Sequence, residues 1–232
     1  MAEVPLLHTR LICAIRLLIM IIQKVIKGVR DLDDAAVNRI FKTGIVCNWW
    51  RTVDPLPRAE VVERLNDRNL LWHQNCYDQP DPMQGGQVFS VNTPFISTTA
   101  GTVERDLVSR TNIVTAAWKT ALSFATDSWL TDGWLFYCHL FVIGKRAVPM
   151  ELFSEEVREL NVYPGFSPYQ PEGEITAKIV IPTTQIERAD FWSLAAARAA
   201  MSSGILPTAS RTLANPNFLP PDDYNNLRDL LV

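Results

Sequence analysis

The sequence has few of the side chains on which metal-dependent and disulfide-rich proteins depend. Its 232 residues include three histidines and four cysteines. The cysteines are scattered and form no Cys-x-x-Cys pair, so we expect neither a metal site nor a disulfide framework. The four thiols, which we expect to be reduced and mostly buried, are Cys13, Cys47, Cys76 and Cys138.

An excess of positive charge is also missing. The 25 Asp and Glu residues outnumber the 22 Lys and Arg residues, and the net charge is −3. Without an overall basic field, nucleic acid is not an expected partner. Near the N-terminus the longest uninterrupted apolar run, Leu17–Ile22, is far shorter than the roughly 20 residues of a membrane-spanning helix. Arg16 interrupts the stretch that resembles the apolar part of a signal peptide, so no cleavable signal is expected.

What the sequence does have is apolar side chains, 47% of the total, which is enough for a packed core. Residues 11–30 combine many of these with five polar side chains that fall in one sector of a helical wheel. The five are Arg16, Gln23, Lys24, Lys27 and Arg30. This pattern predicts a cationic amphipathic helix, which either packs on the main domain or makes a peripheral contact with an anionic membrane surface.

Along the rest of the chain, helical and strand-like patterns alternate. Helices are expected at 35–44, with Asp33 or Asp34 as cap and Gly44 as stop, and at 57–67, 112–127, 150–161 and 193–203. Extended segments are expected at 69–74, 87–99, 134–144, 174–182 and 184–192, and one or two helical turns at 222–232. Helices followed by a strand-rich body indicate the α+β class.

Two glutamates, Glu172 and Glu174, stand one residue apart where the expected strand at 174–182 begins. Residues i and i+2 of an extended segment point to the same side, so both carboxylates could face one cleft. The alternative is two solvated acids at a strand end.

The stretch EGEITAKIVIPTTQI (172–186) resembles the Glu-x-Glu strand of the mono-ADP-ribosyltransferase toxins of the cholera and pertussis group. Upstream, PFISTTA (94–100) is similar to that family's aromatic-hydrophobic-Ser-Thr-Ser motif. LLWHQNCYDQPDP (70–82) is similar to its opening Leu-aromatic-Arg-x-Asp stretch. His73 replaces the family's arginine, as in the diphtheria-type branch, Asn75 replaces the aspartate, and Thr99 replaces the last serine.

The resemblance implies a split, mixed or antiparallel β-sheet core with flanking helices. We expect this catalytic domain at 68–195, a helical N-terminal extension at 1–67 and a helical tail at 196–232. NAD is the implied co-substrate, without a metal.

The resemblance also implies roles for individual residues. Glu174 would stabilise the positive charge that develops on the ribose of NAD, and Glu172 would orient or deprotonate the acceptor. Ser97 would fix the rotamer of a catalytic glutamate. The remaining candidates for binding NAD are His73, Gln74, Phe95, Thr98 and Thr99. For each of these residues an ordinary structural role is the alternative. His73 would then be a partly buried histidine, Thr98 and Thr99 part of a Thr-rich strand, and Phe95 a core residue.

The implied function is transfer of one ADP-ribose from NAD to an arginine, or to a threonine or serine hydroxyl, of a host protein such as a small GTPase or ubiquitin. A cysteine-poor chain of this kind resembles an effector translocated into the host cytoplasm. The alternatives are an NAD glycohydrolase, a catalytically inactive module that binds NAD or a protein, and a membrane-associated scaffold organised by residues 11–30.

Overall fold

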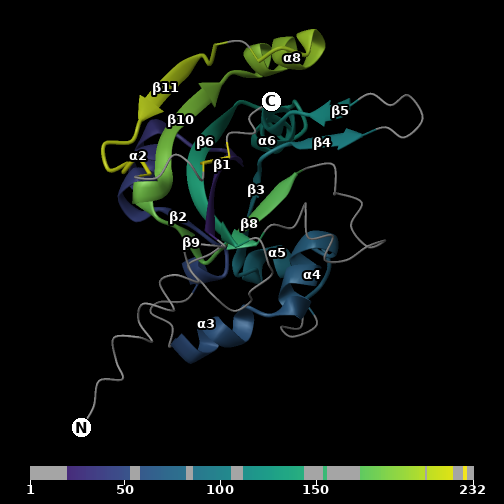
Figure 1. Ribbon diagram of the computed structural model, residues 1–232, viewed down its shortest axis with the longest axis vertical. Helices are drawn as coiled ribbons and strands as arrows, with labels where there is room; N and C mark the ends of the chain where they lie inside the picture. The colour runs from purple at the N-terminus through teal and green to yellow at the C-terminus, as the bar shows by residue number, and fades with distance from the viewer. Residues whose placement is uncertain are drawn as a thin grey trace.

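The structure, a computed structural model, describes residues 20–52, 58–81, 86–105, 112–143, 154–155, 173–206, 208–221 and 227–228. Eight strands form one mixed sheet in the order β11-β10-β6-β7-β8-β3-β1-β12, with β6 also paired to β1 (Figure 1). These strands are β1 (Met20–Arg30), β3 (Phe95–Thr99), β6 (Gly133–Ile143), β7 (Ser154–Glu155), β8 (Glu174–Lys178), β10 (Ile186–Trp192), β11 (Arg211–Ala214) and β12 (Leu227–Arg228). Two small sheets join β2 (Ile45–Val46) to β9 (Val180–Ile181) and β4 (Thr102–Arg105) to β5 (Asn112–Thr115).

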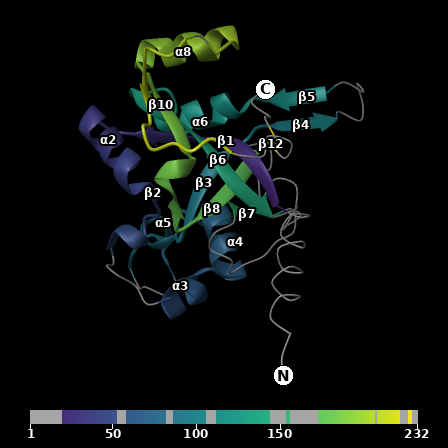
Figure 2. The ribbon, with the colours of Figure 1, turned by 60° about the vertical axis from the view of Figure 1, so that its left-hand side comes forward.

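The helices flank this sheet, which confirms the α+β class. They are α2 (Asp34–Thr43), α3 (Arg58–Arg64), α4 (Asp67–Asn75), α5 (Phe89–Asn92), α6 (Ala117–Ala125) and α8 (Leu194–Ser203), with short 3-10 turns η1 (Trp50–Thr52) and η3 (Thr183–Gln185). Helix α8 lies at one end of the molecule and α3 and α4 at the other (Figures 1 and 2). Among the described residues, no helix combines the length and the apolar character that crossing a bilayer requires.

Strand β6 is the centre of the sheet and the point where it splits. It is antiparallel to β1 over its whole length, from Gly133 opposite Arg30 to Ile143 opposite Met20. Its other edge is shared, because residues 133–138 pair with β10 and residues 142–143 pair with β7. The predicted split, mixed sheet is therefore confirmed. An uninterrupted apolar run suits this position, since a central strand is covered on both faces.

The two faces of the sheet carry separate cores. Trp134, Phe136 and the other even-numbered residues of β6 belong to the core that includes Phe41 of α2. Leu135 and Tyr137 point to the opposite face and pack with apolar residues of α6 and α8. Helix α6 lies very close to the β1–β6 pair: a Cβ on Gly28 would be 2.0 Å from the carbonyl oxygen of Ala121. Glycine at position 28 thus fixes how near α6 comes to the sheet.

The prediction of an amphipathic helix at 11–30 is wrong for residues 20–30, because these residues form the central strand β1. The segment is rich in Ile and Val, whose β-branched side chains favour strands. Val25 and Ile26 point to opposite faces, and each is buried in a different core. Pairing with β6 along eleven residues outweighs the helical spacing of the basic side chains. Residues 11–19, the rest of the proposed membrane contact, lie outside the described residues.

Other local predictions also need correction. Residues 69–74 are not a strand but part of α4, whose start is set by Asn66, the side chain of which accepts the amide N–H of Asn69 (2.9 Å). The stretch 87–99 is not extended throughout, because α5 precedes β3. The helix expected at 112–127 begins only at Ala117, after β5.

In the C-terminal half, two predictions of helices are wrong for the residues that the structure describes, because these residues form short strands. Residues 154–155 pair with β6 as β7, and residues 227–228 pair with β1 as β12. The remainder of the segments 150–161 and 222–232 lies outside the described residues. Strands β1 and β12 lie in the segments predicted to be a helical N-terminal extension (1–67) and a helical C-terminal tail (196–232). Both strands nevertheless belong to the same sheet as β3, β6 and β8.

Several predictions are confirmed. Helix α2 begins after Asp33, whose carboxylate accepts the amide N–H of Ala36 (2.7 Å), and ends at Gly44 with φ +83. The strands expected within 134–144, 174–182 and 184–192 are β6, β8 with β9, and β10. The helix expected at 193–203 is α8. Three of the four cysteines are described, and all three are free thiols.

Candidate active site

The β3–β8 pair places four polar side chains on one face. In this antiparallel register Ser97 lies opposite Thr176, and Thr99 lies opposite Glu174. Because side chains alternate along a strand, these four residues share a face, whereas Thr98 and Ile175 point to the other. The hydroxyl of Thr98 donates to the carbonyl oxygen of Ile175 (2.5 Å) and so stabilises the pairing of the two strands.

Gly173 sets the point at which β8 begins. Its φ of +62 is a left-handed conformation, and a Cβ there would be 2.4 Å from the carbonyl oxygen of Gly101. Glycine is therefore required between the two glutamates. The regular alternation that we assumed for residues 172–174 starts only at Glu174. Glu172 itself lies outside the described residues.

Helix α4 supplies the second wall of the site. Two consecutive residues of this helix, His73 and Gln74, are both buried, and they contact the face of β3 and β8 that carries Ser97 and Thr176. The amide nitrogen of Gln74 donates to the hydroxyl of Thr176 (3.3 Å). Helix α4 thus holds the side chains that the first motif contributes, in place of the strand expected from sequence.

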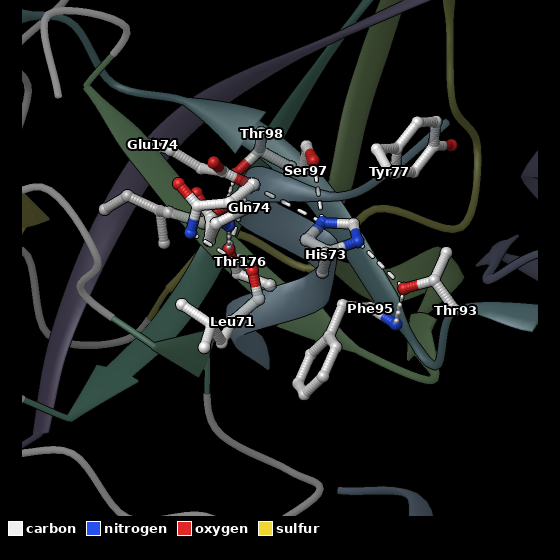
Figure 3. A network of polar contacts seen from close by, with 12 residues as sticks. Leu71, His73, Gln74, Tyr77, Thr93, Phe95, Ser97, Thr98, Glu174 and Thr176 are labelled. Atoms are coloured by element: carbon white, nitrogen blue, oxygen red, sulfur yellow. Dashed lines mark hydrogen bonds and ion pairs between the residues drawn. The ribbon is translucent and has the colours of Figure 1, made fainter. Parts of the chain in front are cut away.

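His73 is fixed from both of its ring nitrogens, as Figure 3 shows. Nδ1 lies 2.8 Å from Oγ1 of Thr93, which also accepts the amide N–H of Phe95 (3.2 Å). Nε2 lies 2.8 Å from Oγ of Ser97 and 3.6 Å from Oε1 of Glu174. His73 is 5% exposed, and its ring packs edge-on against Tyr77, with centroids 5.6 Å apart. Its position leaves it little rotational freedom.

Glu174 is a buried carboxylate surrounded by donors. The residue is 8% exposed, and the hydroxyl of Thr176 donates to Oε1 (3.0 Å). Burial raises the pKa of Glu174, but hydrogen bonding to His73, the charge of His73, and hydrogen bonds from Gln74 and Ser97 outweigh it. The net result is a pKa below the ordinary value of glutamate, so the group is held as a carboxylate.

A cavity of two adjoining lobes opens above these residues. The smaller, which we call the glutamate lobe, has a volume of about 320 Å³ and is lined by Gln74, Asn75, Thr99 and Glu174, among others. The larger, the basic lobe, has a volume of about 950 Å³. His73, Tyr77, Ser97, Phe124 and Lys27 line both lobes, so the two meet beside the carboxylate. Volumes of roughly 300–1,000 Å³ are usual for small-molecule sites.

Cationic side chains outnumber acidic ones in the lining of the basic lobe. Four line it, together with two acidic residues, Asp78 and Asp127. The cations are Lys27, Arg30, Arg51 and Lys119. Arg30 is paired with Asp127, whose Oδ1 lies 2.6 Å from its Nη1. This excess of positive charge suits an anionic ligand, although the whole chain is slightly acidic.

The structure therefore brings together most of the residues predicted from sequence. His73, Gln74, Ser97, Thr98, Thr99 and Glu174 all line one cavity. Phe95 is 2% exposed, borders the basic lobe, and packs in the core against the ring of His73. Thr98 is buried and occupied with strand pairing. The role of each of these residues in binding stays a prediction.

Sequence reasoning missed several residues of the site. Thr176 could have been found, because it stands two positions after Glu174 on the same strand face. Lys27 and Arg30 were assigned to the solvated stripe of a helix, and the wrong period hid their place in the cavity. Tyr77 and Arg51 carried no signal in the sequence.

The arrangement can stabilise a positive charge. A carboxylate kept ionised in a buried, hydrogen-bonded setting acts on a developing cation more strongly than one in water. No group of three or more His, Cys, Asp or Glu residues suited to a metal is found in the described ranges.

Comparisons with known proteins give a fold likeness only. No protein-family description matches the sequence, and no curated protein matches it significantly. Among solved structures, one similar chain is the catalytic domain of the mosquitocidal toxin from Bacillus sphaericus, in a point-variant form. Its TM-score is 0.42 and its identity 15%, and the match covers 88% of this chain and 61% of that one. The chain thus spans less than two thirds of that toxin domain. Another is EcPltA, with a TM-score of 0.43, 14% identity, and coverage of 85% of this chain and 88% of that one.

Proposed function

We propose that the chain is an NAD-dependent protein mono-ADP-ribosyltransferase, which moves one ADP-ribose from NAD to a side chain of another protein. One observation carries the proposal. Glu174 is buried, is held ionised by His73, Gln74 and Ser97, and lines the glutamate lobe next to the residues that this lobe shares with the basic lobe. A charge-stabilising carboxylate beside an anion-binding lobe is what cleavage of a cationic, phosphate-bearing donor requires.

The residues present fit NAD. Its diphosphate matches the cations of the basic lobe, and its reactive ribose matches the carboxylate of Glu174. NAD, when bound, supplies an ADP-ribosyl group joined through ribose C1′ to nicotinamide, a leaving group that needs no acid.

Glu174 would stabilise the positive charge that develops at C1′ as the C1′–nitrogen bond breaks and its electron pair leaves with nicotinamide. His73 and Thr176 would hold the carboxylate in place, and Ser97 would hold the ring of His73. The acceptor atom forms the new bond to C1′ and releases a proton. Glu172, outside the described residues, is the candidate base for that proton.

The acceptor is expected to be an arginine, or a threonine or serine hydroxyl, in a host protein such as a small GTPase or ubiquitin. These finer points, like delivery into a host cell, rest on the resemblance of the sequence motifs and are part of the proposal.

The test is incubation of the purified chain with labelled NAD and a host-cell lysate. We expect a labelled protein band that is absent with Glu174→Gln and present with Glu187→Gln. Glu187 is a suitable control because it is a half-buried glutamate of β10 that pairs with Lys24, outside the cavity. Nicotinamide release without a labelled band would favour the glycohydrolase. Neither product from a correctly folded chain would contradict the proposal and indicate a module that only binds.

A further inference from the structure

Lys27 is the cation of β1 that lies between the two lobes. The strand is central in the sheet: Lys27 is opposite Phe136 of β6, and the preceding Ile26 is opposite Thr99 of β3. The side chain of Lys27 is half-buried and lines both the glutamate lobe and the basic lobe. Lys27 therefore borders the junction of the two lobes, and its ammonium group is close enough to Glu174 for the two charges to influence each other.

The other cations of this strand have carboxylate partners. Lys24 lies 3.8 Å from Glu187, and Arg30 lies 2.6 Å from Asp127. For Lys27, no hydrogen bond or ion pair of the ammonium group is found within the residues that the structure describes. Its electrostatic neighbours include Glu174, which attracts it from beyond ion-pair distance, and Arg51, which repels it, with a smaller influence from Cys138.

Burial of the charged Lys27 ammonium group costs free energy unless an anion binds to it. Burial lowers the pKa of Lys27, because the charged form loses contact with water, while Glu174 recovers part of that loss. A cation without a close partner is uncommon in a central strand, where most side chains are apolar. A phosphate group at the junction would supply the missing negative charge and hydrogen-bond acceptors.

We propose that Lys27 is a positioning residue that binds the diphosphate of the donor, with Arg51 of η1 as a second cation on the same group. The inference rests on the proposed function. In NAD, the diphosphate is separated by one ribose from the carbon that reacts. With that carbon at Glu174, the diphosphate falls at the junction of the lobes and the adenosine extends into the basic lobe. Lys27 would thereby fix the distance between C1′ and the carboxylate.

The test compares Lys27→Met with Lys24→Met. Both substitutions remove one ammonium group from β1 and keep a long unbranched side chain, but Lys24 lies outside the cavity. Calorimetric titration with ADP-ribose is expected to give a dissociation constant roughly 10- to 100-fold weaker for Lys27→Met and within about 2-fold of wild type for Lys24→Met. Lys27→Arg, which keeps the charge, should recover most of the affinity.

Two further readouts separate binding of phosphate from a structural role. For nicotinamide release, Lys27→Met should raise KM for NAD by a similar factor and change kcat much less. Inhibition by free nicotinamide, which lacks phosphate, should be unchanged. Should Lys27→Met fail to fold, as judged by circular dichroism and thermal unfolding, Lys27→Gln takes its place.

The outcomes distinguish the two proposals. If the wild-type chain uses NAD and Lys27→Met, or its glutamine replacement, binds ADP-ribose as tightly as Lys24→Met, the role of Lys27 is wrong and the proposed function stands. If nicotinamide inhibition weakens as much as ADP-ribose binding, Lys27 shapes the whole site and the diphosphate assignment is wrong. If wild type binds neither NAD nor ADP-ribose, both proposals fail.

Discussion

Nε2 of His73 lies 3.6 Å from Oε1 of Glu174, and the two side chains come from helix α4 and strand β8, which both line the cavity. The contact joins the first sequence motif to the third. Because Nδ1 is fixed by Thr93, the ring presents Nε2 to Ser97 and Glu174 at the same time. The hydrogen bond and charge of His73 are, after burial, the largest influences on the pKa of Glu174, and both lower it.

Substitution of His73 by alanine should therefore impair the carboxylate without removing it. We expect nicotinamide release at neutral pH to fall by roughly 10²-fold, the range seen for loss of one donor in a charge-stabilising site. The pKa of Glu174 should rise, which moves the acid limb of the pH–rate profile to higher pH. His139→Ala is the control, since His139 is also a buried histidine but lies 3.6 Å from Glu187, outside the cavity. An unchanged acid limb in His73→Ala would contradict this account.

Stability should depend on the ionisation of Glu174 at acidic pH. The folded-state pKa of this group is depressed, so its ionisation favours the folded state above the unfolded-state pKa of about 4.3. That contribution is lost as the pH falls through the lower folded-state pKa. We expect the free energy of unfolding of wild type, relative to Glu174→Gln, to be constant from pH 7 to about pH 5 and to decline below it. Urea titrations at several pH values measure this difference, and a difference that stays flat down to pH 2 would refute the depressed pKa.

Thr176→Val should weaken activity while leaving the carboxylate present. The substitution removes the hydroxyl that donates to Glu174 and accepts from Gln74, and it keeps the shape of the side chain. We expect a loss of about 1 kcal/mol in stability and roughly 10-fold in the rate of nicotinamide release. Thr212→Val is a matched control, because Thr212 also donates to a carboxylate, Asp190 (2.7 Å), but on β11 away from the cavity. Equal effects of the two substitutions on the rate would show that Thr176 has no special relation to the reaction.

Gly173→Ala should disturb the start of β8. Gly173 and Gly204 have similar left-handed conformations, with φ of +62 and +69. A Cβ on Gly204 meets nothing within 4 Å, whereas one on Gly173 would collide with the backbone of Gly101. Gly204→Ala should thus cost only the conformational strain, about 1 kcal/mol, and keep activity. Gly173→Ala should lose clearly more stability, measured by urea unfolding, and displace Glu174 enough to reduce the rate by at least about 10-fold. Similar unfolding midpoints for the two variants would mean that the contact with Gly101 is unimportant.

The candidate site was predictable from sequence to the extent that its residues lie on regular strands. Glu174 and Ser97 are on β8 and β3, whose apolar and β-branched patterns are strong enough to be read locally. His73 was found from its motif, although the element that carries it was predicted wrongly. The cap formed by Asn66 was the signal for helix α4, and it outweighs the strand-like composition of residues 69–74.

The sequence by itself determined the α+β class, helices α2 and α8, and strands β6, β8 and β10, because caps and hydrophobic runs act within a few residues. Only the tertiary structure decided that residues 20–30 form a central strand and that Lys27 faces the cavity, since helical and extended conformations both accommodate that stretch until β6 pairs with it. The left-handed Gly173 was likewise decided by a distant contact, with Gly101. Long-range pairing and close backbone approach depend on residues far apart in the chain, and no local pattern records them.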